Sequence, residues 1–308
     1  MIKEASGMAK HKNSASSKTD GLLNWSDFKT VKGKTIYAIM LILLILLSLV
    51  CLLPVIWIFL SSIKTAEEML KIPPTIFPHS FNVSQIGRVW KMANIGKYFK
   101  NSVFIIVGCW AFDVFFNGLA GYVLSRLKPK GSAFISTLIF WTMMMPGMSI
   151  VPLYMTYIDL PIFHINLLGT FWPIWLAVTT NAFNIFLFRN FFNGIPMDYI
   201  EAARIDGCGE MKTFFSIILP LAKPVVMCVT IFSVIGSWSN FFWPYIILGS
   251  TQKEPISVLI FKLTTAGSPF KVNEQMTIMM ISIVPPIIMY AFLSKQIMGG
   301  MNMSGIKG

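Results

Sequence analysis

Long apolar runs alternate with short polar stretches along most of this chain. Six of the runs are long enough to cross a membrane, because a spanning helix needs roughly 20 residues. They lie near residues 35–61, 102–124, 133–158, 169–190, 225–249 and 275–298. Prolines interrupt the third, fifth and sixth runs, which a helix bundle tolerates where neighbouring helices satisfy the freed backbone groups. The pattern predicts an all-α integral membrane protein with six transmembrane helices.

Composition leads to the same class of protein. Of the 308 residues, 55% are hydrophobic and 12% are charged, whereas a soluble domain is about 25% charged. The net charge of +12 fits lysine and arginine in cytoplasmic loops. Because no segment forms a basic soluble domain, we expect no nucleic-acid partner. The four cysteines form no CxxC pair and the three histidines have no metal-ligand spacing, so we predict no metal site.

The distribution of basic residues sets the expected topology. Residues 1–34 are polar and rich in serine and lysine, and they are predicted to form a disordered tail. With that tail inside, 16 of the 25 lysines and arginines fall in inner segments. The positive-inside rule then places both termini, including a short tail at 301–308, in the cytoplasm.

A charged stretch, EAARIDGCGEMKTFFSIILP, lies in the polar segment 191–224 between the fourth and fifth runs. Asp198 is placed to cap a helix that begins at Tyr199, and Glu201 lies at the spacing of a capping box. Gly207 is predicted to end that helix in the left-handed conformation. Such a helix could lie on the bilayer surface or dock against another protein.

A second helix is expected to follow from about Gly209. Its apolar residues share one stripe at helical spacing: Phe214, Ile217, Ile218 and Leu221. On the first helix, the i, i+3 spacing of Glu201 and Arg204 predicts a pair with each other or with charges of a partner.

The spacing of this stretch resembles the cytoplasmic EAA loop of binding-protein-dependent ABC transporter permeases. Glu201-Ala202-Ala203 is followed by three residues, Gly207, nine residues and then Ile217-Ile218-Leu219-Pro220, without a gap. The stretch also lies between two spans on the predicted cytoplasmic side. Cys208 departs from the family, in which alanine or a similar small residue is usual.

The resemblance extends from about residue 35 to the end of the chain. The outer-loop opening SSIKTAEEM, the Asn101-Ser102 pair and the terminal SGIKG are similar to the carbohydrate-uptake branch, and within it to the maltose-type six-span subunit. The resemblance implies a permease domain over residues 35–300 in the bacterial plasma (inner) membrane. It implies that the chain forms half of the pathway of an ATP-driven importer for a di- or oligosaccharide.

In this family the EAA loop is a coupling helix that docks on a separate ATPase subunit. The resemblance assigns docking to Glu201, Ala202, Ala203, Arg204, Asp206 and Gly207, and a further ATPase contact to Ser304, Gly305 and Gly308. The implied partners are a second homologous permease, two ATPase subunits, an extracytoplasmic solute-binding protein, the saccharide and membrane lipid. This chain has no Walker A sequence, so we expect it to bind no cofactor and to be no enzyme, with ATP and Mg on the ATPase subunits.

The loop between the last two spans is expected to hold a short helix and a turn. In the maltose-type family this loop reaches toward the binding protein. The corresponding residues here are Gly267, Ser268 and Pro269.

Polar residues inside the spans are candidates for the solute pathway. Asp113 is the only acid in a span, and Asn117 lies one turn further on the same face. They form either a polar wall of the pathway or hydrogen bonds between helices. Further candidates, chosen because sugars need amide groups and aromatic faces, are Asn181, Asn184, Trp238 and Asn240. Other aromatic residues are assigned to an interfacial belt: Trp172, Trp175, Trp243 and Tyr245.

Two alternative functions stay open from the sequence. The first is an ABC permease for another solute, such as amino acids or phosphonates. The second is an intramembrane enzyme, which would need a catalytic pair at membrane depth. The spans contain no histidine and a single acid, so the second alternative is disfavoured.

Overall fold

The structure is a computed structural model that describes residues 31–144, 150–161, 163–249, 251–263, 265 and 267–301, with side chains up to residue 292. Within these residues the chain forms helices and loops and no strand. The chain divides into two compact units, Met1–Trp57 and Ile58–Gly308. The described part of the first unit is helical throughout, and it forms most of α1 (Val31–Ser62). Because α1 begins at Val31, residues 31–34 are not part of a disordered tail; the rest of that predicted tail lies outside the described residues.

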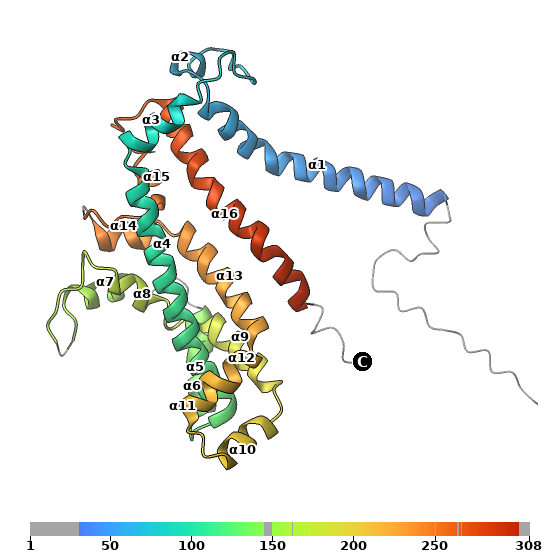
Figure 1. Cartoon of the computed structure of the whole chain (residues 1–308), viewed down its shortest axis with the longest axis vertical. Coiled ribbons are helices and arrows are strands. Elements are labelled where there is room, and N and C mark those ends of the chain that lie inside the picture. The colour runs from blue at the N-terminus through green and yellow to red at the C-terminus, as the bar shows by residue number, and fades with distance from the viewer. Residues whose placement is uncertain are drawn as a thin grey trace, which may run out of the picture. The chain divides into compact units, whose positions relative to one another are not determined.

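In the second unit the helical run Ile95–Leu127 extends from one end of the unit to the other, and shorter helices lie along it (Figure 1). In chain order they are α2 (Ala66–Met69), α3 (Ser84–Met92), α4 (Ile95–Phe112), η2 (Asp113–Asn117), α5 (Gly118–Tyr122), η3 (Val123–Leu127), α6 (Ser132–Met144), α7 (Ile150–Ile158), α8 (Trp172–Ala177), α9 (Ala182–Asn193), α10 (Asp198–Ile205), α11 (Glu210–Thr213), η4 (Phe214–Ile218), α12 (Leu219–Leu221), α13 (Lys223–Ser239), α14 (Phe242–Leu248), α15 (Ile256–Leu263) and α16 (Val272–Met301). The elements η2, η3 and η4 are π-helical. Helix α13 packs against both α4 and α16, and α5 packs against α9.

Three helices of the described chain are long and apolar enough to cross a membrane: Val31–Ser62, the continuous run Ile95–Leu127 and Val272–Phe292. A fourth candidate is the pair Glu210–Leu221 and Lys223–Ser239, which is bent by 84°. The second predicted span therefore begins at Ile95 and not near residue 102. The six predicted spans do not all appear as single long helices.

The predicted span at 169–190 is broken into α8 and α9. Residues 178–181 connect the two helices, and the side chain of Asn117 bonds to the backbone there. Its Nδ2 donates to the carbonyl of Val178 at 2.9 Å, and its Oδ1 accepts from the N–H of Asn181 at 3.1 Å. A distant side chain thus satisfies backbone groups that a continuous helix would pair internally.

The span predicted at 225–249 is broken in the same way, at Asn240. Its Oδ1 accepts from the N–H of Trp243 at 3.3 Å, and its carbonyl accepts from Ser257 Oγ at 2.9 Å. The run at 133–158 consists of α6 and α7, and the stretch between them lies outside the described residues. Local hydrophobicity found the apolar segments, but it did not reveal these breaks.

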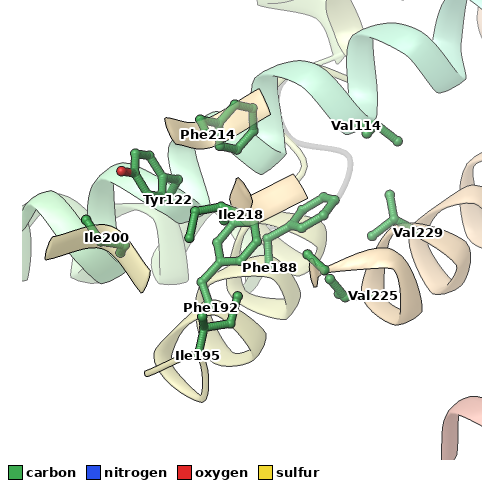
Figure 2. Close-up of a cluster of buried hydrophobic side chains, with 11 residues drawn as sticks. Val114, Tyr122, Phe188, Phe192, Ile195, Ile200, Phe214, Ile218, Val225 and Val229 are labelled. Atoms are coloured by element: carbon green, nitrogen blue, oxygen red, sulfur yellow. The ribbon is translucent and has the colours of Figure 1, made fainter. Parts of the chain in front are cut away.

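An apolar cluster joins α5, α9, α10, η4 and α13 at one end of the second unit (Figure 2). Phe188, Phe192, Phe214, Ile200 and Ile218 are fully buried there. A β-carbon built on Gly121 of α5 would lie 2.6 Å from Phe188 Cβ. Only glycine permits this close approach of α5 to α9.

The opposite end of the unit carries α2, α3, α15 and the start of α16. Gln85 is buried there, and its Nε2 donates to Ser62 O, Asn273 O and Thr277 Oγ1 at 3.2, 3.0 and 2.8 Å. Helix α15 confirms the short helix predicted between the last two runs.

Candidate functional site

Helix α10, which carries the Glu-Ala-Ala sequence, presents one face to the interior and one to the surroundings. Ile200 is 0% exposed and Ala203 is 3% exposed, so both pack inward. Glu201 and Ala202 are exposed, and Ile205 is 86% exposed. Ala203, one of the residues to which the resemblance assigned docking, therefore faces the interior of this chain. The exposed residues of α10 are Asp198, Tyr199, Glu201, Ala202, Arg204 and Ile205.

Gly207 ends α10 in the left-handed conformation, with φ of 74°, as predicted. Its N–H donates to Arg204 O at 3.0 Å, and the N–H of Cys208 donates to Ala203 O at 2.9 Å. These two bonds form a Schellman motif, which satisfies the last carbonyls of the helix. A β-carbon on Gly207 would meet no atom within 4 Å, so backbone conformation, not space, demands glycine here.

The predicted capping box is absent at the start of α10. The helix begins at Asp198, its N-cap is Met197, and no side chain caps it. Asp198 lies one position too far along the chain to act as N-cap. Its carboxylate and that of Glu201 instead lie in the first turn, where the helix dipole favours negative charge.

The predicted apolar stripe of the second helix is wrong in part. Phe214 and Ile218 are buried, but Leu221 is exposed and Ile217 is only half-buried. The π-helical segment η4 is the physical reason, because it adds residues to a turn and moves the buried positions onto a spacing of four. The buried stripe continues with Ala222 and Val225.

Arg204 forms an ion pair with Glu210. The pair of Arg204 with Glu201, one of the two possibilities that the helical spacing predicted, is not formed. Arg204 Nε and Nη2 lie 3.1 and 2.9 Å from Glu210 Oε1. The other carboxylate oxygen, Oε2, accepts from the hydroxyl of Tyr122 at 2.8 Å. Glu210 thus connects α10, α11 and α5. Among the described residues, the side chain of Glu201 makes no hydrogen bond or ion pair and stays available to a partner.

The hydrogen bond from Tyr122 holds the pKa of Glu210 below its ordinary value, with Arg204 acting in the same direction and partial burial opposing both. The carboxylate is therefore ionised at neutral pH. Close by, Arg126 donates to the carbonyls of Phe192 and Ile195 and covers the C-terminal end of α9.

The structure brings together four of the six predicted pathway residues. Asp113 is 2% exposed, and both of its oxygens accept from Asn184 Nδ2, at 2.9 and 3.0 Å. Asn117 Nδ2 donates to Asp113 Oδ1 at 2.6 Å. Asn181 Oδ1 accepts from the N–H of Asn184 at 3.2 Å and so caps α9. For Asp113 and Asn117 this geometry matches hydrogen bonding between helices.

A cavity of ≈ 330 Å³ lies beside this network, within the second unit. It is bordered by the two broken helices, α8–α9 and α13–α14. Its polar lining includes Asp113, Asn181, Asn184, Asn240 and Ser237, and its aromatic lining includes Phe183, Phe232 and Trp243. The Oδ1 atom of Asn184 is buried and has no hydrogen-bond partner among the described residues.

Trp238 does not join this site. Its ring packs against Phe99 with centroids 5.7 Å apart, in a separate cluster that includes α3, α15 and α16. Trp243 is likewise buried and donates from Nε1 to Pro173 O at 3.4 Å, so it is no interfacial-belt residue.

The remaining predicted contact residues lie elsewhere. Gly267 and Pro269 are exposed in the loop after α15, and Gly267 has φ of 92°. Ser304, Gly305 and Gly308 lie outside the described residues.

Sequence reasoning missed Ile205 and Tyr122. Ile205 has a local signal, since an apolar residue lies three positions after Ala202 on a face that is otherwise polar. Tyr122 has no such signal, because its partner Glu210 is 88 residues away in the chain.

A family model described as "Binding-protein-dependent transport system inner membrane component" matches residues 117–299. The chain is 30% identical to the arabinooligosaccharides transport system permease protein AraQ of Bacillus subtilis (strain 168), over 89% of this chain and 97% of that protein. It is 27% identical to the polygalacturonan/rhamnogalacturonan transport system permease protein YtcP of the same strain, over 86% of this chain and 96% of that protein.

A solved structure shares the fold. It is a chain of a bacterial ABC transporter involved in the import of the acidic polysaccharide alginate, and it superimposes with a TM-score of 0.77 at 26% identity. The match covers 86% of this chain and 98% of that chain.

Proposed function

The chain belongs to the family of binding-protein-dependent transport system inner membrane components, and we propose that it is a permease subunit of an ATP-driven importer for a di- or oligosaccharide. It would form half of the translocation pathway beside a second, homologous permease. Relatives that carry sugars support a saccharide over amino acids or phosphonates. ATP and Mg would be bound by two separate ATPase subunits.

The observation that carries the coupling role is the two-faced helix α10. Its inner face is fixed by Ile200 and Ala203, and its Schellman turn at Gly207 fixes where it ends. Its outer face presents Glu201, Ala202 and Ile205, whose side chains make no hydrogen bond or ion pair with the residues that the structure describes. A rigid element with an exposed apolar residue and a free carboxylate is suited to a protein groove.

The alternative that α10 lies on the bilayer surface is less suited to its charges. Interfacial helices carry lysine and arginine toward anionic lipid. The exposed residues Asp198, Glu201 and Asp206 are acidic, and the only basic residue of α10, Arg204, is paired with Glu210. Acidic charge on this surface favours a protein partner that carries basic side chains.

The proposed substrate wall is the cavity bordered by the broken helices. Transporters build midplane solute sites from discontinuous helices, whose freed polar groups face the solute. Asn181, Asn184 and Asn240 line this cavity, and the unpartnered Oδ1 of Asn184 would accept a hydrogen bond from a sugar hydroxyl. Asp113 and Asn117 would act indirectly, by holding Asn184 and the α8–α9 break in place.

The extracytoplasmic solute-binding protein would contact the loop that contains Gly267, Ser268 and Pro269. The tail residues Ser304, Gly305 and Gly308 would add a second ATPase contact. With this arrangement both termini are cytoplasmic and the chain spans a bacterial inner membrane.

Reconstitution of the complex in proteoliposomes tests this function. The chain, its partner permease, its ATPase subunits and its binding protein are purified together, and the ligand of the binding protein is identified. We expect a saccharide to bind, to be taken up and to stimulate ATP hydrolysis. Tight binding of an amino acid with no binding of sugars would contradict the saccharide assignment.

A further inference from the structure

Tyr122, Glu210 and Arg204 connect the proposed docking helix to a spanning helix. Tyr122 is the last residue of α5 and belongs to the continuous run Ile95–Leu127. Its hydroxyl bonds to one oxygen of Glu210, and Arg204 of α10 bonds to the other. We call these three side chains the bridge.

We propose that the bridge is the positioning device that transmits movement of α10 to the spanning helix, with Tyr122 and Glu210 acting as positioning residues for coupling. This inference rests on the proposed function, because it requires α10 to be moved by an ATPase subunit. It adds a specific route for that movement within this chain.

Apolar packing alone would hold α10 near the span but would not fix its orientation. The buried contacts of Ile200 and Ala203 are non-directional, as hydrophobic contacts are in general. Hydrogen bonds to a carboxylate are directional and short. Glu210 uses one oxygen for each neighbour, so loss of the tyrosine hydroxyl would remove this directional link to the span and leave the Arg204–Glu210 pair and the apolar packing intact.

The same spanning helix reaches the cavity. Tyr122 follows Asp113 by nine residues, which corresponds to about 14 Å along a helix at 1.5 Å per residue. Asp113 and Asn117 hold Asn184 and the break between α8 and α9. A displacement applied at Tyr122 is therefore delivered by one helix to the residues that border the cavity.

The substitution Tyr122→Phe tests the bridge with minimal disturbance, because it removes the hydroxyl and keeps the ring contacts with Phe192 and Phe214. The matched control is Tyr157→Phe, since Tyr157 is also buried but its hydroxyl makes no hydrogen bond within the described residues. The measured quantity is the number of ATP molecules hydrolysed per saccharide imported by the reconstituted complex, together with co-purification of the ATPase subunits.

We expect Tyr122→Phe to raise ATP use per saccharide by roughly fivefold or more, the lower end of ordinary coupling between sites. ATPase subunits should still co-purify, and Tyr157→Phe should match the wild type. An unchanged ratio in Tyr122→Phe, an equal rise in Tyr157→Phe, or loss of the ATPase subunits would each overturn the inference. Failure of the proposed function looks different, because the wild-type complex itself would then show no saccharide-dependent ATP hydrolysis.

Glu210→Gln provides a second, independent variant. If both residues act through one bridge, the double variant Tyr122→Phe/Glu210→Gln should raise ATP use per saccharide no more than the stronger single variant does. A rise in the double variant that equals the product of the two single rises would contradict a shared bridge. Should the Tyr122→Phe chain fail to fold and insert into the membrane, Glu210→Gln alone decides. The same rise in ATP use then supports the bridge, and an unchanged ratio overturns it.

Discussion

A glycine at position 207 can be required by the backbone conformation that ends α10 or by contact of a partner with this position. Replacement of Gly207 distinguishes these two reasons. Its φ of 74° lies in the left-handed region, which costs an L-residue with a β-carbon about 1–2 kcal/mol. The space around it within this chain is open, so no packing cost adds to that value. A cost of this size lowers the population of the closed turn by a factor of roughly 5–30.

The comparison of Gly207→Val with Gly207→Asn is the informative one. Asparagine tolerates the left-handed conformation and valine does not. We expect Gly207→Val to lose most of the saccharide-stimulated ATPase activity while membrane insertion persists, and Gly207→Asn to keep most of it. The assay is ATP hydrolysis by the reconstituted complex with and without loaded binding protein. Equal losses in both variants would refute the backbone argument and indicate contact of the partner with this position. Normal transport by Gly207→Val would refute the coupling role of the turn.

Three further predictions concern packing, the buried network and pH. Gly121→Val should lower the free energy of unfolding by about 1–3 kcal/mol, because the valine side chain overlaps α9. The control is Gly87→Ala, whose added carbon meets no atom within 4 Å and which should leave the thermal midpoint unchanged or raised. Asp113→Ala should lower the thermal midpoint of the detergent-purified complex, because Asn184 Nδ2 loses the carboxylate to which it donates, at a cost of about 1–3 kcal/mol. An unchanged midpoint would show that the network contributes no stability. The lowered pKa of Glu210 means that its stabilising contribution is complete above the unfolded-state pKa and disappears as pH falls through the folded-state pKa. Glu210→Gln should therefore lose less thermal stability than wild type between pH 7 and pH 4, and an identical loss would contradict this.

Local features of the fold were predictable from the sequence. The left-handed turn at Gly207 followed from a glycine placed after a helical segment, and it is confirmed. The proximity of Asp113 and Asn117 followed from their i, i+4 spacing, and it is confirmed as a 2.6 Å hydrogen bond.

Features that depend on distant partners were not predictable. The break between α8 and α9 is held by Asn117, which lies 61 residues before Val178 in the chain. Arg204 pairs with Glu210 because the turn at Gly207 folds α11 back toward α10, which helical spacing alone does not show. Likewise, the π-helical segment η4 changes the period of the buried stripe, and a pattern search at 3.6 residues per turn places Leu221 on the wrong face.

Site-specific crosslinking from α10 tests the central claim most directly. A photoreactive residue at position 205, where Ile205 is 86% exposed, is compared with one at position 200, where Ile200 is 0% exposed. The coupling account predicts a crosslink from position 205 to the ATP-hydrolysing subunit of the assembled complex, and none from position 200. Crosslinks from position 205 to lipid alone, or equal crosslinks from both positions, would contradict it.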